Sequence, residues 1–231
     1  MLDKLVFYNT CGAGDIFESR EFIKDYIKLF PAKEYYYAHK QHPRILSDIP
    51  NIKYTKLDDF MNVKMPFVNV ENSLYINTWI GRSNKYVIGT GGCVVEKLYD
   101  MHNEITKVLT NTTLPRSVYE YVPNIDFSYY DISGVDKFIK TERKNRRMVL
   151  IDNGKVLSKQ AENFDFTPVI LRLAQEFKDI IFVITHEIPT ELPNIFTTAS
   201  IVKSKYNFDL NEISYLSKFC DTLVGRCSGP H

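Results

Sequence analysis

A short apolar strand, a loop of small or polar residues and an amphipathic helix follow one another twice in this chain. The first set is residues 5–8 (LVFY), the loop GAGD at 12–15, and apolar residues at helical spacing from 16 to 30. The second is residues 148–151 (MVLI), a polar loop, and a helix over 166–177. Strands that are apolar on both faces and alternate with helices are typical of parallel sheets covered by helices. We therefore predict an α/β fold of two Rossmann-like halves that face each other across a cleft.

The rest of the chain completes both halves and places a boundary between them. Further helices are expected at 94–109 and 210–219, and further strands at 34–38, 52–54, 66–81, 180–185, 195–196 and 222–224. The stretch 136–147 (DKFIKTERKNRR) is strongly charged, which favours a solvated helix and linker. We predict an N-terminal domain over 1–132, a charged linker over 133–147 and a short C-terminal domain over 148–231.

Charge and composition exclude several classes of protein. The formal net charge is +1, from 29 basic and 28 acidic residues, so no overall field attracts nucleic acid or an anionic membrane. The four cysteines lack zinc-ligand spacing. No apolar stretch approaches the ~20 residues of a membrane span, and the first one is shorter than the ~7–15 of a signal peptide. We expect a soluble, cytoplasmic protein without a nucleic-acid partner or a membrane span.

Polar residues of chemical interest follow directly after apolar strands, where an open α/β sheet binds its ligands. In the first half they are Gly12, Gly14 and Asp15, with Arg20 assigned to the same segment. In the second half the candidates are Gly154, Lys155, Ser158, His186, Arg226, Ser228 and Gly229.

The second-half candidates suit a phosphorylated ligand. Ser228 and Gly229 precede a proline that can begin a helix, and the N–H groups at a helix N-terminus bind phosphate or diphosphate. Arg226 could add a charge-assisted contact, Lys155 could neutralise diphosphate charge, and His186 could contact a base or ribose. The structural alternatives are a capped turn without a ligand, a solvent-facing lysine and a hydrogen-bonded histidine.

Asp15 has the wrong charge for a phosphate loop. A carboxylate opposite a bound diphosphate would sit where a general base takes a proton from a hydroxyl nucleophile. The structural alternative is an N-cap for the helix that follows, which is a common use of aspartate.

Two segments resemble the heptosyltransferase-like family of glycosyltransferases, which have the two-domain GT-B architecture. The family's first loop carries Gly-Asp at the start of a helix, as in GAGDIFESREF here. Its second domain carries a helix, a strand and a Ser/Thr-Gly-Pro turn, as in LNEISYLSKFCDTLVGRCSGPH at 210–231. Cys227 stands where the family usually has an acidic residue, and GT-B proteins continue through further helices beyond this turn. The resemblance therefore implies a minimal or truncated second half.

The resemblance implies an inverting, metal-independent sugar transfer without a cofactor. Asp15 would be the catalytic base, with Gly12, Gly14 and Arg20 on the acceptor side. Ser228 and Gly229 would hold the diphosphate, and Lys155 or Arg226 would stabilise its developing charge. The partners implied are a nucleotide sugar and a carbohydrate acceptor.

Two other functions remain open from the sequence. One is a nucleotide-sugar epimerase that uses Asp15 and His186 as acid and base on the sugar itself. The other is a non-catalytic module for a nucleotide sugar or phosphate, in which Asp15 only caps a helix. The sugar, the nucleotide, the acceptor and the oligomeric state do not follow from the sequence.

Overall fold

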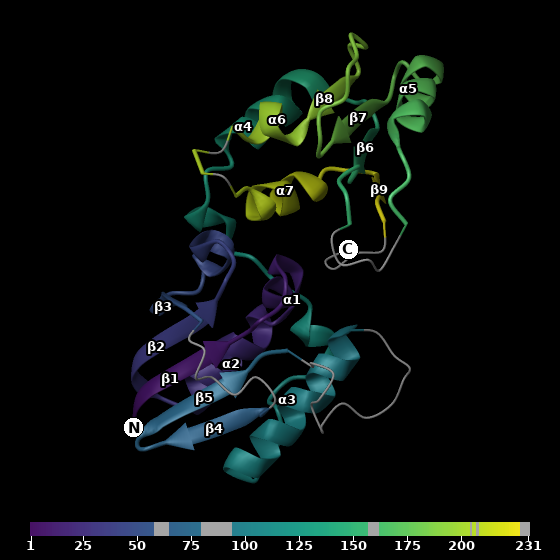
Figure 1. Ribbon diagram of the computed structural model, residues 1–231. Helices are drawn as coiled ribbons and strands as arrows, with labels where there is room; N and C mark the ends of the chain where they lie inside the picture. Colours follow the sequence, from purple (N-terminus) through teal and green to yellow (C-terminus); the bar gives the residue numbers. More distant parts are fainter. Residues whose placement is uncertain (58–64, 80–93, 157–161, 204, 207, 227–231) are drawn as a thin grey trace. The chain divides into compact units, whose positions relative to one another are not determined.

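The computed structural model describes residues 1–57, 65–79, 94–156, 162–203, 205, 206 and 208–226, and they form two compact α/β units (Figure 1). The first unit is Met1–Ile125, and the second begins at Asp126. The predicted boundary at residue 132 lies seven residues further along the chain.

The first unit contains a five-stranded sheet in the order β3-β2-β1-β5-β4. Its strands are β1 (Leu2–Tyr8), β2 (Ala32–His39), β3 (Ile52–Lys56), β4 (Phe67–Val70) and β5 (Ser73–Asn77). All neighbours pair in parallel except β4, which lies antiparallel to β5 at the sheet edge. The predicted strands at 34–38, 52–54 and 66–81 correspond to these elements.

The α-helices that accompany this sheet among the described residues are α1 (Ala13–Glu18), α2 (Arg20–Leu29) and α3 (Val94–Thr110). Phe22 of α2 stacks on His102 of α3, with ring centroids 4.4 Å apart, so the two helices pack together. The helix predicted over 16–30 is divided at Ser19, whose hydroxyl donates to the Ile16 carbonyl at 2.7 Å. Helix α1 is therefore a separate short element placed directly after the loop that follows β1.

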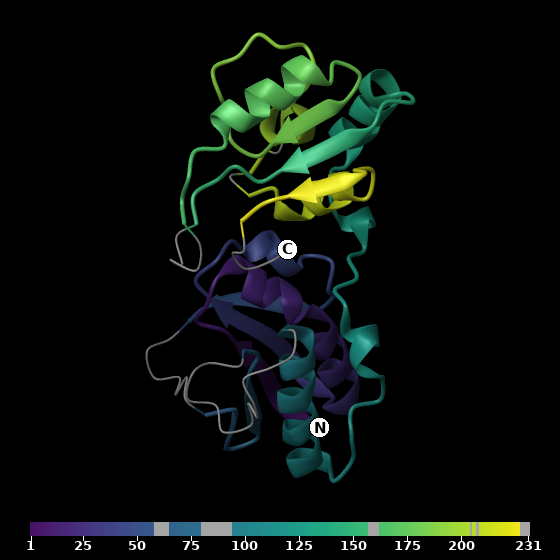
Figure 2. The same ribbon diagram turned by 90° about the vertical axis from the view of Figure 1, so that its right-hand side faces the viewer.

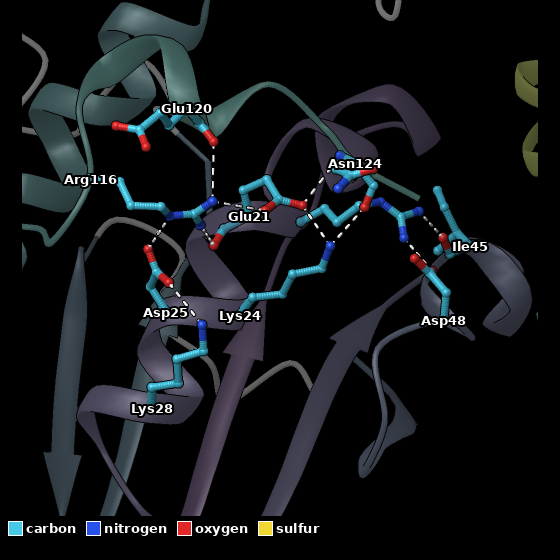
Figure 3. Close-up of polar contacts among 10 residues, drawn as sticks. Glu21, Lys24, Asp25, Lys28, Ile45, Asp48, Arg116, Glu120 and Asn124 are labelled. Carbon is cyan, nitrogen blue, oxygen red and sulfur yellow. Dashed lines mark hydrogen bonds and ion pairs between the residues drawn. The ribbon is translucent and has the colours of Figure 1, made fainter. Parts of the chain in front are cut away.

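An ion-pair network fixes the segment after α3 to helix α2 (Figure 3). Arg116 Nε lies 2.8 Å from Asp25 Oδ2, and Arg116 Nη1 lies 3.0 Å from Glu21 Oε2. Both carboxylates are almost fully buried. Lys24 Nζ lies 2.6 Å from Glu21 Oε1 and donates to the Asn124 carbonyl at 2.7 Å. The last part of the first unit is thus held to α2 by charge-assisted hydrogen bonds.

The second unit contains a four-stranded, all-parallel sheet in the order β8-β7-β6-β9. Figure 2 shows the green β7, the teal β6 and the yellow β9 side by side. Its strands are β6 (Met148–Ile151), β7 (Ile181–Ile184), β8 (Ile195–Thr197) and β9 (Thr222–Val224). Helix α5 (Thr167–Glu176) packs on one face through Ile170 and Ala174. Helices α4 (Ser133–Phe138), α6 (Thr198–Val202) and α7 (Leu210–Ser217) pack on the other.

The charged stretch after residue 132 belongs to the second unit and is not a free linker. Helix α4 and the π-helical turn Ile139–Arg143 occupy it. Val135 and Phe138 are buried in the core that covers β6 and β7. The charged residues of the 133–147 stretch, read alone, indicate a solvated segment. Two apolar side chains at helical spacing are nevertheless enough to attach this stretch to the sheet.

In each sheet the first strand lies in the interior, and successive strands are added on one side of it and then on the other. This change of direction determines where a ligand site can form. In the first unit β1 lies between β2 and β5, and in the second β6 lies between β7 and β9. Ligands of open α/β sheets bind beyond the carboxyl ends of the strands on either side of such a reversal. The loops after β1, β5, β6 and β9 are therefore the candidate positions, and the predicted Asp15 and Gly154 segments lie in two of them.

Candidate functional site

Asp15 lies in the first turn of α1, directly after the loop that leaves β1. Gly12 is the N-cap of this helix, and its backbone N–H donates to Asp15 Oδ2 at 2.7 Å. Asp15 is thus not the N-cap but the third helical residue, and one of its carboxylate oxygens caps the Gly12 N–H, which is the half of a capping box that a glycine N-cap allows. Its other oxygen, Oδ1, accepts no hydrogen bond from the residues that the structure describes.

The surroundings of Asp15 favour the protonated form of its carboxyl group. Burial raises the pKa of Asp15, and the Gly12 N–H opposes this only in part. Burial and the Asp15 charge also raise the pKa of Glu18, one turn further along α1. A raised carboxyl pKa is what a general base needs to hold a proton at neutral pH. Glu18 was not singled out in the sequence, although its spacing of three residues from Asp15 is a signal that the two share a helix face.

A largely buried chain of hydrogen bonds lies at the carboxyl ends of β1, β2 and β5. The Tyr37 hydroxyl lies 2.7 Å from Thr78 Oγ1 and 3.0 Å from Ser19 Oγ. Asn9 Nδ2 donates to Thr78 Oγ1 at 3.3 Å, and Asn9 Oδ1 accepts from the Cys11 N–H at 2.8 Å. This chain joins the start of the Asp15 loop to Ser19, at the end of α1. It therefore fixes the short helix at both sides of Asp15.

The other first-unit candidates take different places. Gly12 is exposed, whereas Gly14 is buried within α1. Arg20 is fully buried at the start of α2, where its guanidinium pairs with Asp48 and donates to the Ile45 carbonyl at 2.7 Å (Figure 3). Its assignment to the acceptor-side loop is therefore corrected: Arg20 holds the segment around residue 45 to α2. The sequence could not indicate this, because Asp48 lies 28 residues away.

In the second unit, the loops after β6 and β7 are joined by side-chain hydrogen bonds. Asn153 Oδ1 accepts from the His186 N–H and Asn153 Nδ2 donates to the His186 carbonyl, both at 2.8 Å. The Thr185 hydroxyl donates to Asp152 Oδ1 at 2.8 Å and lies 3.1 Å from His186 Nδ1. The imidazole of His186 is exposed at this edge of the sheet. Asp152 and Thr185 were missed in the sequence because their contact spans 33 residues.

Gly154 lets the first of these loops approach the imidazole. A Cβ atom at residue 154 would lie 2.6 Å from His186 Cε1 and 2.9 Å from Nδ1. Real Cβ atoms do not come so close, so a side chain at this position would displace the ring. The glycine predicted as a ligand-loop residue is thus also required for the packing of His186. Lys155, the next residue, is exposed.

Arg226 follows β9 and is largely buried. Its guanidinium donates to the carbonyls of Gly154 and Phe164 and lies over the rings of Phe164 and Phe166, 4.9 and 4.5 Å from their centroids. These contacts join the β9 end of the sheet to the segment that precedes α5. The structure thus brings Gly154, His186 and Arg226 together at the carboxyl ends of β6, β7 and β9. The Arg226 guanidinium is already bound there by backbone carbonyls and aromatic rings of the protein.

Three predicted residues, Ser158, Ser228 and Gly229, lie outside the described residues. Within the described ranges, no group of three or more His, Cys, Asp or Glu side chains could hold a metal ion. No described helix is long and apolar enough to cross a membrane.

Comparison with solved structures identifies the fold. The E. coli ADP-heptose LPS heptosyltransferase II is similar with a TM-score of 0.55 at 12% identity, over 98% of this chain and 80% of that one. E. coli heptosyltransferase WaaC with ADP is similar with a TM-score of 0.52 at 9% identity, over 98% and 82%. The chain has a heptosyltransferase-like fold. This confirms the predicted α/β architecture of two Rossmann-like units.

A third similar structure is longer. The iron-containing dodecameric glycosyltransferase TibC from enterotoxigenic E. coli gives a TM-score of 0.51 at 13% identity, over 99% of this chain and 54% of that one. This chain thus spans about half the length of TibC. Neither a protein-family model nor a curated protein sequence matches the chain. Identities this low establish the shared fold, while the reaction has to be argued from the site.

Proposed function

We propose that this protein is an inverting, metal-independent glycosyltransferase that moves a sugar from a nucleotide sugar to a hydroxyl group of a glycan or glycolipid. The observation that carries the proposal is the Asp15 carboxylate. It lies beyond the end of β1 at the order reversal of the sheet, with one oxygen fixed by Gly12 and the other open. The similarity to solved glycosyltransferases supports sugar transfer as the reaction class.

In the proposed reaction Asp15 Oδ1 accepts the proton of the acceptor hydroxyl while that oxygen attacks the anomeric carbon. The new carbon–oxygen bond forms as the bond from the anomeric carbon to the diphosphate breaks, and the nucleoside diphosphate leaves with the electron pair. A single displacement inverts the configuration at that carbon. The raised pKa of Asp15 supports this role, because a base with an ordinary aspartate pKa would hold the proton weakly.

The second unit would bind the donor. Lys155 is exposed at the sheet edge, where an ammonium group can neutralise charge that develops on the diphosphate. Ser228 and Gly229 would add hydroxyl and backbone donors, as the resemblance implies. Arg226 would act indirectly, because its contacts to the Gly154 and Phe164 carbonyls hold the loop that carries Lys155.

The Asp15→Asn variant, assayed with and without an acceptor, distinguishes the proposed transferase from the epimerase and the binding module. The asparagine keeps an oxygen that can accept from the Gly12 N–H, so this cap and the fold should remain. We expect turnover to fall by roughly 10²- to 10⁴-fold, the usual contribution of a general base, with donor affinity nearly unchanged. Glu104→Gln is the matched control, because it removes one exposed carboxylate on α3.

The assay is release of nucleoside diphosphate from a panel of nucleotide sugars, with and without carbohydrate acceptors. Turnover that requires an acceptor and is lost in Asp15→Asn supports the transferase. Conversion of the donor sugar without an acceptor would favour the epimerase. Donor binding with equal, negligible turnover in the wild-type protein and in Asp15→Asn would favour the binding module.

A further inference from the structure

Within the described part of the chain, the exposed imidazole of His186 is hydrogen-bonded through one nitrogen. Nδ1 lies 3.1 Å from Thr185 Oγ1, and Nε2 has no hydrogen-bond partner among the described residues. The backbone of His186 is fixed on both its N–H and its carbonyl by the Asn153 amide. The ring therefore presents one open nitrogen from a backbone that is held in place.

The neighbours of Thr185 determine which nitrogen of the neutral ring carries the hydrogen. The Thr185 hydroxyl has one hydrogen and two acceptors in reach, Asp152 Oδ1 at 2.8 Å and Asn153 Oδ1 at 3.2 Å. The charged Asp152 carboxylate accepts only and is nearer than His186 Nδ1 at 3.1 Å, so the hydroxyl hydrogen goes to Asp152. Thr185 Oγ1 can then only accept from His186.

The Asn153 amide orientation supports this assignment. Its oxygen accepts from the His186 N–H while its nitrogen donates to the His186 carbonyl, so a flipped amide would lose both bonds. With Nδ1–H donating to Thr185, the neutral imidazole keeps a lone pair on Nε2.

We propose that Asp152, Thr185 and His186 form a relay that presents His186 Nε2 as a hydrogen-bond acceptor, and that this nitrogen binds a donor group of the nucleotide. A ribose hydroxyl and an exocyclic amino group of the base have the required chemistry. A phosphate oxygen only accepts, so the diphosphate is the partner of Lys155 and not of the neutral His186 ring. The choice of a nucleotide as the ligand rests on the proposed function, whereas the tautomer does not.

The tautomer is measured first, on the unliganded protein. Two-bond ¹H–¹⁵N correlations at pH 8 show which ring nitrogen of His186 is protonated, and His186→Ala assigns the signals. We expect hydrogen on Nδ1 in the wild-type protein and in Thr185→Ser, which keeps the hydroxyl. Thr185→Val, which has nearly the same shape, should lose the preference. Hydrogen on Nε2 in the wild-type protein would overturn the relay.

The ligand group is measured by calorimetric titration of ADP, its 2′- and 3′-deoxy analogues, inosine diphosphate and pyrophosphate. His186→Ala should weaken the binding of ADP roughly 5- to 10-fold, as expected for one hydrogen bond, and leave the affinity for pyrophosphate unchanged. The effect should vanish with one deoxy analogue if the partner is that ribose hydroxyl, and with inosine diphosphate if it is the base amino group. An equal loss for pyrophosphate would overturn the assignment.

The two measurements separate this proposal from the proposed function. If no nucleotide binds the wild-type protein while Nδ1 carries the hydrogen, the proposed function and the ligand assignment fail and the relay stands. If nucleotides bind while Nε2 carries the hydrogen, the relay fails and the proposed function stands.

Discussion

Acid should destabilise the first unit through the buried side chain of His102. This histidine lies on α3, where its ring stacks on Phe22 and its Nδ1 lies 3.2 Å from the Tyr26 hydroxyl. Burial lowers the pKa of His102 from 6.5 to about 3. The folded state therefore keeps the ring neutral, while the unfolded chain takes up a proton as the pH falls through 6.5.

The sign and size of the effect follow from this difference. The contribution to stability is complete above pH ~6.5 and is lost as the pH falls from there toward the pKa of the folded state. Each pKa unit corresponds to about 1.36 kcal/mol, so at pH 5 the free energy of unfolding is lower by about 2 kcal/mol than at pH 8. His39 acts in the same direction, because burial lowers its pKa to about 4.

Urea unfolding followed by tryptophan fluorescence measures this effect. The chain has one tryptophan, Trp79, which follows β5 and lies in the same unit as His102. His102→Gln replaces the titrating ring with a neutral amide and should lower stability at pH 8, because the stacking on Phe22 is lost. The difference in unfolding free energy between wild type and variant should then shrink by about 2 kcal/mol from pH 8 to pH 5.

A parallel loss of stability in both proteins over this pH range would refute the reasoning. It would mean that His102 binds protons equally in the folded and unfolded states, and that other groups cause the acid sensitivity. A His39→Gln, His102→Gln double variant should show a flatter pH dependence than either single variant.

Three further substitutions test other parts of the structure. Arg116→Met removes the guanidinium that bridges the buried Glu21 and Asp25 carboxylates, which should cost about 3 kcal/mol and lower the Tm by roughly 10 °C in calorimetry; a change of only a few degrees would contradict it. Tyr37→Phe removes the link between Ser19 and Thr78 near Asp15, so kcat should fall while KM stays constant, and an unchanged kcat would show that the hydroxyl does not position the base. Gly154→Ala should lower the unfolding free energy by about 1–3 kcal/mol in urea titrations followed by circular dichroism, because the new Cβ meets His186. The cost should disappear when His186→Ala is added, and its persistence would contradict the packing.

The sequence predicted the layers of the fold well, because the strands are nearly continuous apolar runs. The MVLI and IIFVIT stretches became β6 and β7, and the helix predicted over 94–109 became α3. The division of the first helix at Ser19 could not be predicted, since it involves contacts with Tyr37 from another strand. The buried part of the charged stretch around Val135 was missed because the charges around it dominate the local pattern.

The site was predicted only in part. Asp15, Gly154 and His186 were selected because strand ends in α/β sheets are ligand positions, and the structure places each of them after a strand end. Their roles in a site stay predictions. The partners that fix them, Thr78 and Asp152, act over long sequence separations and leave no local signal. Long-range side-chain contacts of this kind are visible only once the strand order is known.

A thermal-shift panel tests whether this chain binds a nucleotide sugar without a metal, as we propose. Nucleoside diphosphates and nucleotide sugars are added in EDTA, with pyrophosphate as the control anion and Asp15→Asn as the control protein. A ligand at 100 times its Kd stabilises the folded state by about 2.7 kcal/mol, which is readily detected. We predict a selective shift by one nucleotide family in both proteins. No shift from any nucleotide, or a shift from pyrophosphate as large as from every nucleotide, would contradict the proposed function.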